Sequence, residues 1–331
     1  MKNIIVFGAT GNIGVYLMDY LLEHFDKKEY HLVACDIKKT DLFKKMGIEY
    51  VNVDITKKED FLKLPQQDVF AIVNMAGILP AYLPGDFDPE RYLRVNVFGA
   101  LNVMEYARKV KADRVLYTQT WSDLGGYWGK EEVLSSDMPR KLLYTGDHAF
   151  YSITKSMIVD TMEFYHQEYG IKNYVFRLPN IYLYNPQRFY YVDGQKKYIA
   201  YRYMIDRAIA GEDIEVWGNP EAFKDIIYVK DLCQMIYLAI IGNGKPGIYN
   251  AGTGVKTTLK EQIETMVEVF ATDGKKSKLI YKPEKASFTS FVMDIEKAKK
   301  ELGYQPKYFY KEYLEDYKKE MELKRFDELW K

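Results

Sequence analysis

The sequence has few cysteines and histidines, and neither residue type has the spacing of a metal site. Among 331 residues there are two cysteines, Cys35 and Cys233, and four histidines. No HxxxH or HxH group occurs, so we expect no zinc site and no other bound metal. Two distant cysteines are typical of a reducing compartment rather than of a disulfide-linked secreted domain. We therefore expect a cytoplasmic protein.

An excess of charge of one sign and a long apolar run are also missing. Lys plus Arg and Asp plus Glu both number 47, so no basic surplus indicates a nucleic acid partner. No apolar run reaches the roughly 20 residues that span a membrane. The first residues lead into a predicted strand rather than a signal peptide. We expect no membrane and no nucleic acid partner, and a small molecule as substrate.

Short apolar runs alternate with helical patterns in the first half of the chain. Predicted buried strands cover residues 3–9, 31–37, 69–77, 113–120 and 172–179. Predicted amphipathic helices cover residues 14–25, 97–110 and 152–170. Strands that are apolar on both faces, alternating with helices, indicate an α/β fold with a doubly wound parallel sheet.

We predict two parts in this fold. Residues 1–178 form the dinucleotide-binding domain, to which a segment at about 225–250 returns as a strand or loop followed by a helix. Residues 179–331 form a smaller α+β substrate-binding lobe. The Lys- and Glu-rich helix predicted over 311–331 faces solvent.

The first strand is followed by a glycine-rich turn, in the sequence "FGATGNIGVYL". Gly8, Gly11 and Gly14 permit a tight turn, close approach of a diphosphate to the backbone, and close packing of the next helix. The start of that helix offers unpaired N–H groups to phosphates. The context of strand, turn and helix predicts a dinucleotide site.

Asp36 ends the second predicted strand, where a carboxylate accepts hydrogen bonds from the adenosine ribose. Its charge repels a 2′-phosphate, which favours NAD over NADP. Lys38 and Lys39 follow at once and weaken that preference. The alternative is that Asp36 is a turn residue at the end of a strand.

The stretch "AFYSITKSMIVD" places Tyr151 and Lys155 one helical turn apart, on the same face. An ammonium about 4 Å from a phenol lowers the phenol pKa by roughly three units at an effective dielectric of about 20. Tyr151 would then act as a general base. The alternative is a packing tyrosine and a solvated lysine.

Taken in order, the motifs resemble those of the extended short-chain dehydrogenase/reductase family, especially its nucleotide-sugar epimerases and dehydratases. The resemblance runs from Lys2 to about Pro306 and includes "GATGNIG", "VNVDIT", "NMAG", "RVNVFGALNVMEYAR", "RVLYTQTWSDLGG", "YSITK" and "FRLPNIYLYNP". It implies a Rossmann-type fold, NAD as cofactor, and a homodimer formed through the helices at 97–109 and 152–168.

The resemblance also assigns roles to individual residues. The implied catalytic residues are Thr120, Tyr151 and Lys155, with Thr118 as a rival for Thr120. The implied cofactor-binding residues are Gly8, Gly11, Asn12, Ile13, Gly14, Asp36, Asp54, Ile55, Ala76, Gly77, Asn96, Tyr151 and Lys155. The implied substrate-binding residues are Thr120, Asn180, Lys224 and Lys282.

The sequence departs from the family pattern at several of these places. Trp121 and Ser122 follow Thr120 where the 4,6-dehydratases have Asp and Glu, which argues against a dehydratase. Lys224 and Lys282 take the places of arginines that grip the nucleotide diphosphate. Lysine keeps the positive charge but cannot form the two parallel hydrogen bonds of an arginine. The identity of the nucleotide is therefore not determined by these residues.

These features favour a nucleotide-sugar 4-epimerase that oxidises a sugar hydroxyl transiently, with hydride transfer to and from NAD. The alternative is an NAD-dependent dehydrogenase or reductase acting on a non-nucleotide hydroxy or keto substrate. A third reading, an NAD-sensing regulator without catalysis, does not require the Thr, Tyr and Lys together. The stretch 188–204 is rich in aromatic and basic residues. We interpret it as a loop that closes over the sugar and diphosphate of the substrate. The alternative is that it is a packed surface of the lobe with solvated lysines.

Overall fold

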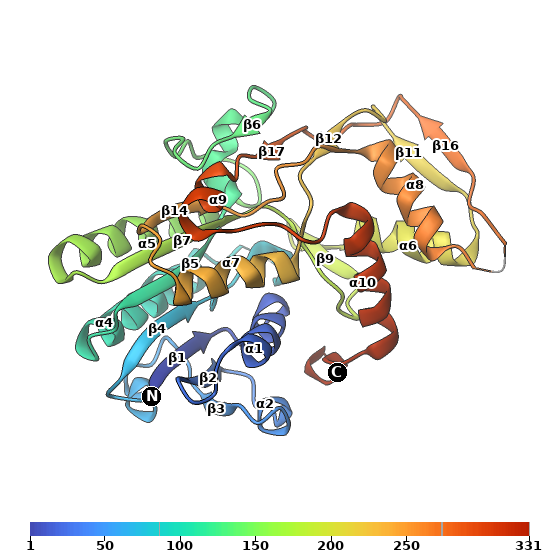
Figure 1. Cartoon of the computed structure of the whole chain (residues 1–331). Helices are drawn as coiled ribbons and strands as arrows, with labels where there is room; N and C mark the ends of the chain where they lie inside the picture. Colours follow the sequence, from blue (N-terminus) through green and yellow to red (C-terminus); the bar gives the residue numbers. More distant parts are fainter. Residues whose placement is uncertain (86, 273, 331) are drawn as a thin grey trace.

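A seven-stranded parallel sheet forms the centre of the computed structural model, which describes residues 1–85, 87–272 and 274–330 (Figure 1). The strand order is β14-β7-β5-β4-β1-β2-β3. The bounds are β1 (Lys2–Phe7), β2 (Tyr30–Asp36), β3 (Glu49–Asn52), β4 (Val69–Asn74), β5 (Arg114–Thr120), β7 (Lys172–Leu178) and β14 (Gly247–Asn250). The order steps outward in both directions from β1 and β4, and confirms the predicted doubly wound α/β fold.

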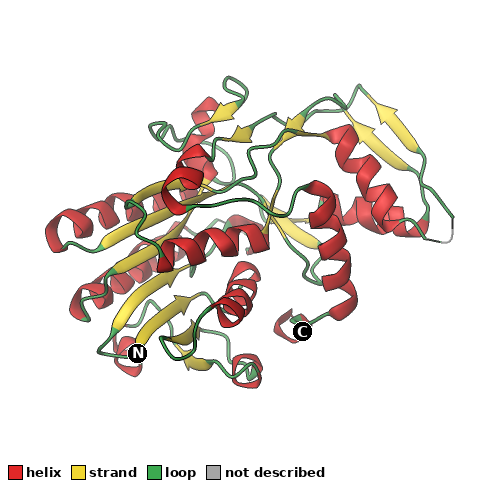
Figure 2. Ribbon diagram, in the orientation of Figure 1, coloured by secondary structure: helices red, strands yellow, loops and turns green. Residues whose placement is uncertain are grey.

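Helices cover both faces of the sheet (Figures 1 and 2). On one face lie α1 (Asn12–His24) and α7 (Val229–Ile241), and on the other lie α4 (Ala100–Lys109) and α5 (Ala149–Tyr169). Alternate residues of β1 enter different cores: Ile4 packs with α1 and α7, whereas Ile5 packs with α4 and α5. This alternation is why the strand sequences are apolar on both faces.

Most of the remaining helices and strands follow β7 in the sequence. Their bounds are α2 (Leu42–Lys45), α3 (Pro89–Tyr92), β6 (Val133–Leu134), β8 (Ile181–Tyr182), β9 (Phe189–Val192), β10 (Gln195–Tyr198), α6 (Ala200–Ala210), β11 (Ile214–Trp217), β12 (Phe223–Lys224), β13 (Ile227–Tyr228), β15 (Thr257–Thr258), α8 (Leu259–Phe270), β16 (Leu279–Lys282), β17 (Val292–Met293), α9 (Glu296–Leu302) and α10 (Tyr310–Leu323). Within this part, α7 and β14 return to the main sheet (Figure 1). The division into a domain and a lobe near residue 178 stays a prediction.

The predicted solvent-facing helix at 311–331 is wrong in its extent and its burial. Helix α10 ends at Leu323 and buries Tyr313, Leu314 and Tyr317. The chain then turns toward α1, where the ring of Phe326 packs edge-on against Tyr16 at 5.1 Å between centroids. The apolar face consists largely of tyrosines, which a count of lysines and glutamates does not reveal.

Candidate active site

The glycine loop joins β1 to α1 and comes into backbone contact with the chain after β4. Gly8 has a φ of +82°, and a Cβ there would lie 2.8 Å from the backbone nitrogen of Ala76. A Cβ on Gly14 would lie 2.1 Å from the carbonyl oxygen of Gly8. Gly11 gives the first turn of α1 no side-chain cap, so its N–H groups stay open. This cradle fits the diphosphate of a dinucleotide.

Asp36 ends β2 and points its carboxylate at the same loop. Its Oδ2 accepts a hydrogen bond from the backbone N–H of Thr10 at 3.0 Å, and its Oδ1 accepts one from Ile37 at 2.7 Å. The carboxylate is therefore held at the rim of the glycine loop. Its contact with a ribose stays a prediction.

Asn12 and Ile13 open helix α1, and Asn12 meets a residue that the sequence analysis missed. The Asn12 Nδ2 donates to the hydroxyl oxygen of Tyr82 at 2.5 Å, while Ile13 packs against the apolar core. Tyr82 ends a short helical turn, Pro80–Tyr82, that follows β4. It also lies near Tyr151, whose pKa it raises. Tyr82 therefore connects the glycine loop with the catalytic tyrosine predicted from the sequence.

Asn96 ties the chain after β4 to helix α5. Its Oδ1 accepts a hydrogen bond from the N–H of Ile78 at 2.8 Å, and its Nδ2 donates to the Ile78 carbonyl at 2.9 Å. The same Nδ2 donates to the hydroxyl of Thr154 at 3.4 Å. A Cβ on Gly77 would lie 3.0 Å from the Asn96 Oδ1, so Ala76 and Gly77 pass close to this side chain. Asn96 thus fixes the segment that the resemblance assigns to the cofactor.

Asp54 and Ile55 have visible structural roles. The Asp54 Oδ1 accepts hydrogen bonds from the backbone and the hydroxyl of Thr56, at 3.0 and 2.7 Å. Ile55 is buried, and its carbonyl oxygen accepts a hydrogen bond from the side chain of Asn102 at 2.9 Å. Asp54 therefore stabilises a turn, and the contact of either residue with adenine stays a prediction.

The three predicted catalytic residues lie at the end of β5 and in the first two turns of α5. Thr120 ends β5, and its hydroxyl is 3.1 Å from that of Ser122. Tyr151 is the third residue of α5, and the buried Lys155 follows one turn later. A hydrogen bond of 3.1 Å from the Gln119 side chain to the Ser156 hydroxyl joins the two elements next to these residues.

Lys155 has an aromatic neighbour that the sequence analysis also missed. Its ammonium lies 3.9 Å from the centre of the Tyr117 ring, within cation–π range. Tyr117 comes from β5 and is buried, and its hydroxyl has no hydrogen-bond partner among the residues that the structure describes. Tyr117 therefore supports Lys155 through the face of its ring.

Burial moves the pKa values of Tyr151 and Lys155 away from what their spacing predicts. Burial raises the pKa of the Tyr151 phenol, and the nearby Tyr82 and Tyr92 add to the increase. Burial lowers the pKa of the Lys155 ammonium from 10.5 to about 7. The prediction that Lys155 by itself acidifies Tyr151 is therefore wrong for the chain alone. Desolvation opposes ionisation of both groups.

The predicted substrate residues lie on separate elements. Asn180 is exposed just after β7, and Lys282 ends β16. Lys224 lies in β12, and its ammonium is 4.9 Å from the Phe288 ring centre and 5.7 Å from that of Tyr182. Lys224 and Lys282 belong to different two-stranded sheets. Their joint action on a diphosphate stays a prediction.

A buried ion pair supports the loop after Thr120. The Arg177 Nε lies 2.9 Å from the Asp123 Oδ1, and neither side chain has any exposed area. The Arg177 Nη1 also donates to the Asn250 Oδ1 at 3.1 Å. Burial raises the pKa of Asp123, and the guanidinium opposes that rise. The pair joins the loop after β5 to β7 and β14, and no spacing in the sequence indicates it.

We expect Asp123→Ala to destabilise the fold by about 3 to 5 kcal/mol, because it leaves the buried guanidinium of Arg177 unpaired. Chemical denaturation with and without the substitution measures this loss. Lys256→Ala is the matched control, since it breaks an exposed ion pair of 3.0 Å with Glu132 and should cost less than about 1 kcal/mol. Equal losses in the two variants would contradict a supporting role for the buried pair.

Two features are absent from the described residues. No group of three or more His, Cys, Asp or Glu side chains is placed to hold a metal ion. Within the same residues, every helix is too short or too polar to cross a membrane.

The doubly wound sheet, the glycine loop, and Tyr151 with the buried Lys155 one helical turn later define a dinucleotide-dependent enzyme. Residues 4–252 match the model of the NAD dependent epimerase/dehydratase family. A provisional UDP-glucose 4-epimerase of Methanocaldococcus jannaschii is 26% identical over 322 residues, covering 93% of this chain and 95% of its own. The dTDP-4-dehydro-6-deoxyglucose reductase of Escherichia coli is 26% identical over 314 residues, covering 92% and 93%.

A solved structure shows the same fold. The UDP-glucose 4-epimerase of Thermotoga maritima, crystallised with UDP-glucose, superimposes with a TM-score of 0.76 at 22% identity, covering 97% of this chain and 99% of its own. The family match spans most of the chain, so the protein belongs to the NAD dependent epimerase/dehydratase family. This confirms the resemblance and NAD as the cofactor.

Proposed function

We propose that this protein is an NAD-dependent nucleotide-sugar epimerase, acting at C4 of the sugar. The observation that carries the proposal is the placement of Thr120, Tyr151 and Lys155 where β5 ends and α5 begins. Binding alone requires neither the phenol nor the threonine hydroxyl, so their presence supports catalysis. The named relatives support a nucleotide sugar as the substrate class.

In the proposed reaction, the Tyr151 hydroxyl exchanges a proton with the sugar hydroxyl at C4. The Thr120 hydroxyl donates a hydrogen bond to the same oxygen, because a hydroxyl can donate and accept at once. NAD, when bound, would supply the acceptor and donor of hydride, and its positive charge would favour the ionised form of Tyr151. Protonated Lys155 stabilises the phenolate form of Tyr151. The keto sugar then turns and receives its hydrogen on the other face.

The lobe offers groups suited to a nucleotide sugar. Lys224 supplies a positive charge between the rings of Tyr182 and Phe288, as a diphosphate beside a base or sugar requires. The hairpin of β9 and β10 adds the aromatic pair Phe189 and Tyr198, whose rings pack edge-on with their centres 4.8 Å apart. These contacts support closure of the stretch 188–204 over the substrate.

The homodimer also stays a prediction. Phe98, Met157 and Phe164 are exposed apolar side chains on the helices that the resemblance assigns to the dimer interface.

We expect the purified protein to convert one nucleotide sugar of a panel (UDP-, GDP-, CDP- and dTDP-linked) into its C4 epimer without net NADH. An epimerase returns its hydride to the substrate, so the absorbance of NADH should stay flat while the sugar configuration changes. Product configuration is followed by NMR and NADH by absorbance. Net NADH would favour the dehydrogenase alternative, which the replacement of two arginines by Lys224 and Lys282 supports. Absence of any thermal shift with every nucleotide sugar would contradict the substrate class.

A further inference from the structure

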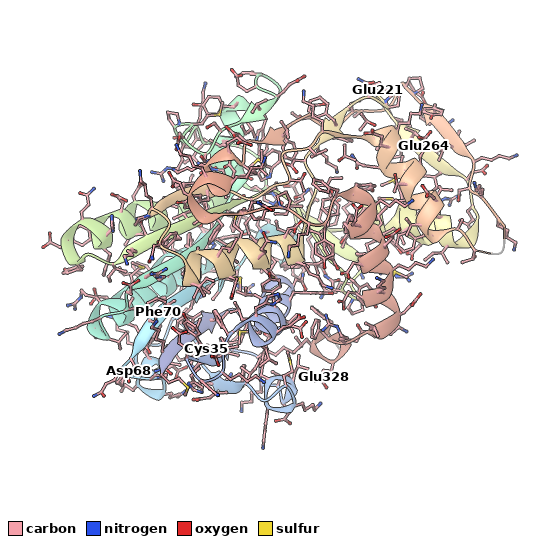
Figure 3. The ribbon with its side chains drawn as sticks, in the orientation of Figure 1. Cys35, Asp68, Phe70, Glu221, Glu264 and Glu328 are labelled. Atoms are coloured by element: carbon pink, nitrogen blue, oxygen red, sulfur yellow. The ribbon has the colours of Figure 1, made fainter. Side chains whose placement is uncertain are left out.

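The last described segment, residues 324–330, lies beside the loop that follows Asp36. The Lys38 ammonium donates a hydrogen bond to the carbonyl oxygen of Leu329. The Lys45 ammonium lies 2.7 Å from a carboxylate oxygen of Glu328, which Figure 3 labels near α2. Lys38, just after β2, and Lys45, at the end of α2, therefore both already have partners in the segment 324–330.

The position of this segment is set by its own packing. Phe326 and Leu329 are 5% and 3% exposed, and the Phe326 ring packs against Tyr16 of α1. The Arg325 Nη1 also lies 2.7 Å from the Asp19 carboxylate on α1. These contacts hold the segment against the dinucleotide-binding domain independently of Lys38, so the Leu329 carbonyl is presented to Lys38 as a fixed acceptor.

The charges near Asp36 decide which dinucleotide fits. NADP differs from NAD by a phosphate on the adenosine ribose, which the Asp36 carboxylate repels and a nearby ammonium attracts. Lys38 is two residues from Asp36, and its loop is further held by the Asn52 side chain, which donates to the carbonyls of Asp36 and Ile37 at 2.9 Å. Lys38 is exposed even with the segment 324–330 in place, so the Leu329 carbonyl fixes the direction of its ammonium and does not cover it.

We propose that residues 324–330 shift the preference toward NAD over NADP by holding the Lys38 ammonium on the Leu329 carbonyl, so that of the two lysines after Asp36 only Lys39 is left to attract a phosphate on the ribose. The neighbouring Lys39 is exposed and follows one residue later. The segment is thus part of the cofactor specificity of this chain, although Leu329 lies 291 residues from Lys38 in the sequence. The proposal rests on NAD as cofactor and not on the identity of the sugar.

The test is equilibrium binding of NAD⁺ and NADP⁺, measured by calorimetry on the full-length protein. Phe326→Ala combined with Leu329→Ala removes the two buried anchors of the segment. We expect NADP⁺ to bind about five-fold more tightly relative to NAD⁺ in this variant, a change at the upper end for an exposed ion pair. Adding Lys38→Ala should remove the gain. Phe309→Ala is the matched control, since Phe309 is 44% exposed at the other end of α10, and should leave the ratio unchanged.

Lys38→Ala in the otherwise unchanged chain tests the proposal without loosening the fold. Because Lys38 is already engaged by Leu329, the ratio of NADP⁺ to NAD⁺ affinity should stay the same. A fall in NADP⁺ affinity in that variant would overturn the proposal, since Lys38 would then already serve the phosphate. A gain in the loosened variant that persists after Lys38→Ala, or no gain while NAD⁺ still binds, would also overturn it.

Discussion

Tyr151→Phe is expected to lower turnover by about a thousand-fold, the range for loss of a general acid–base group. The substitution removes one oxygen and keeps the ring, so the packing at the start of α5 is retained. Cofactor binding should change little, because the glycine loop and Asp36 are untouched. Steady-state turnover on the nucleotide sugar identified from the panel, together with NAD⁺ binding, measures both parts of the expectation.

Tyr144→Phe is the matched control for this substitution. Tyr144 is 77% exposed in the segment that precedes α5, so it undergoes the same chemical change at a place without a proposed role. Its turnover should stay within about two-fold of the unchanged protein, as for other surface substitutions. Unaltered turnover in Tyr151→Phe would remove Tyr151 from the mechanism and leave Thr120 or a bound water as the proton carrier.

The sheet could be predicted from the sequence because its strands are short, apolar on both faces and separated by helical periods. The glycine loop could also be predicted from the sequence, because only glycine fits at position 14, where a Cβ would lie 2.1 Å from the Gly8 carbonyl oxygen. Such constraints act between residues a few positions apart, and they therefore leave a readable pattern. Strand β3 was not predicted as a strand, because its four residues, Glu49–Asn52, are too few for an alternation.

Contacts between distant segments could not be predicted in the same way. Asp123 meets Arg177 from 54 positions away, and Lys38 meets Leu329 from 291 positions away. Asp123 and Arg177 taken alone are each typical of an exposed charge, and only the fold shows that both are buried. Tyr82 is a similar case, because its contact with Asn12 depends on how the chain leaves β4.

The helical spacing predicts correctly that Tyr151 and Lys155 lie on one helix, but it does not predict their pKa values, because it contains no information on burial. Spacing gives the distance between two groups, whereas the pKa depends also on how much water each group loses. Lys155 is 4% exposed, and its ammonium rests on the uncharged ring of Tyr117 rather than on a carboxylate. The chain therefore keeps a costly cation in its interior, as expected of a residue retained for chemistry rather than for stability.

Lys155→Met is accordingly expected to abolish turnover and to raise stability, with a gain that depends on pH. The lowering of the Lys155 pKa from 10.5 to about 7 corresponds to a cost on the order of 5 kcal/mol, which methionine of similar length avoids. Below pH 7 both the folded and unfolded states are protonated, and the cost is fully present. Between pH 7 and 10.5 the unfolded state binds more protons, so the unchanged protein gains stability and the advantage of the variant shrinks.

Thermal unfolding of both proteins without added cofactor, at pH 6 and at pH 9.5, measures this dependence. The melting temperature of Lys155→Met should exceed that of the unchanged protein by several degrees at pH 6 and by clearly less at pH 9.5. Lys300→Met provides the matched control, because Lys300 is an exposed helical lysine. This substitution should change the melting temperature little at either pH. A variant that is less stable at pH 6, or a difference that does not change with pH, would show that Lys155 is not a desolvated ammonium, and the proposed support of the Tyr151 phenolate would fail with it.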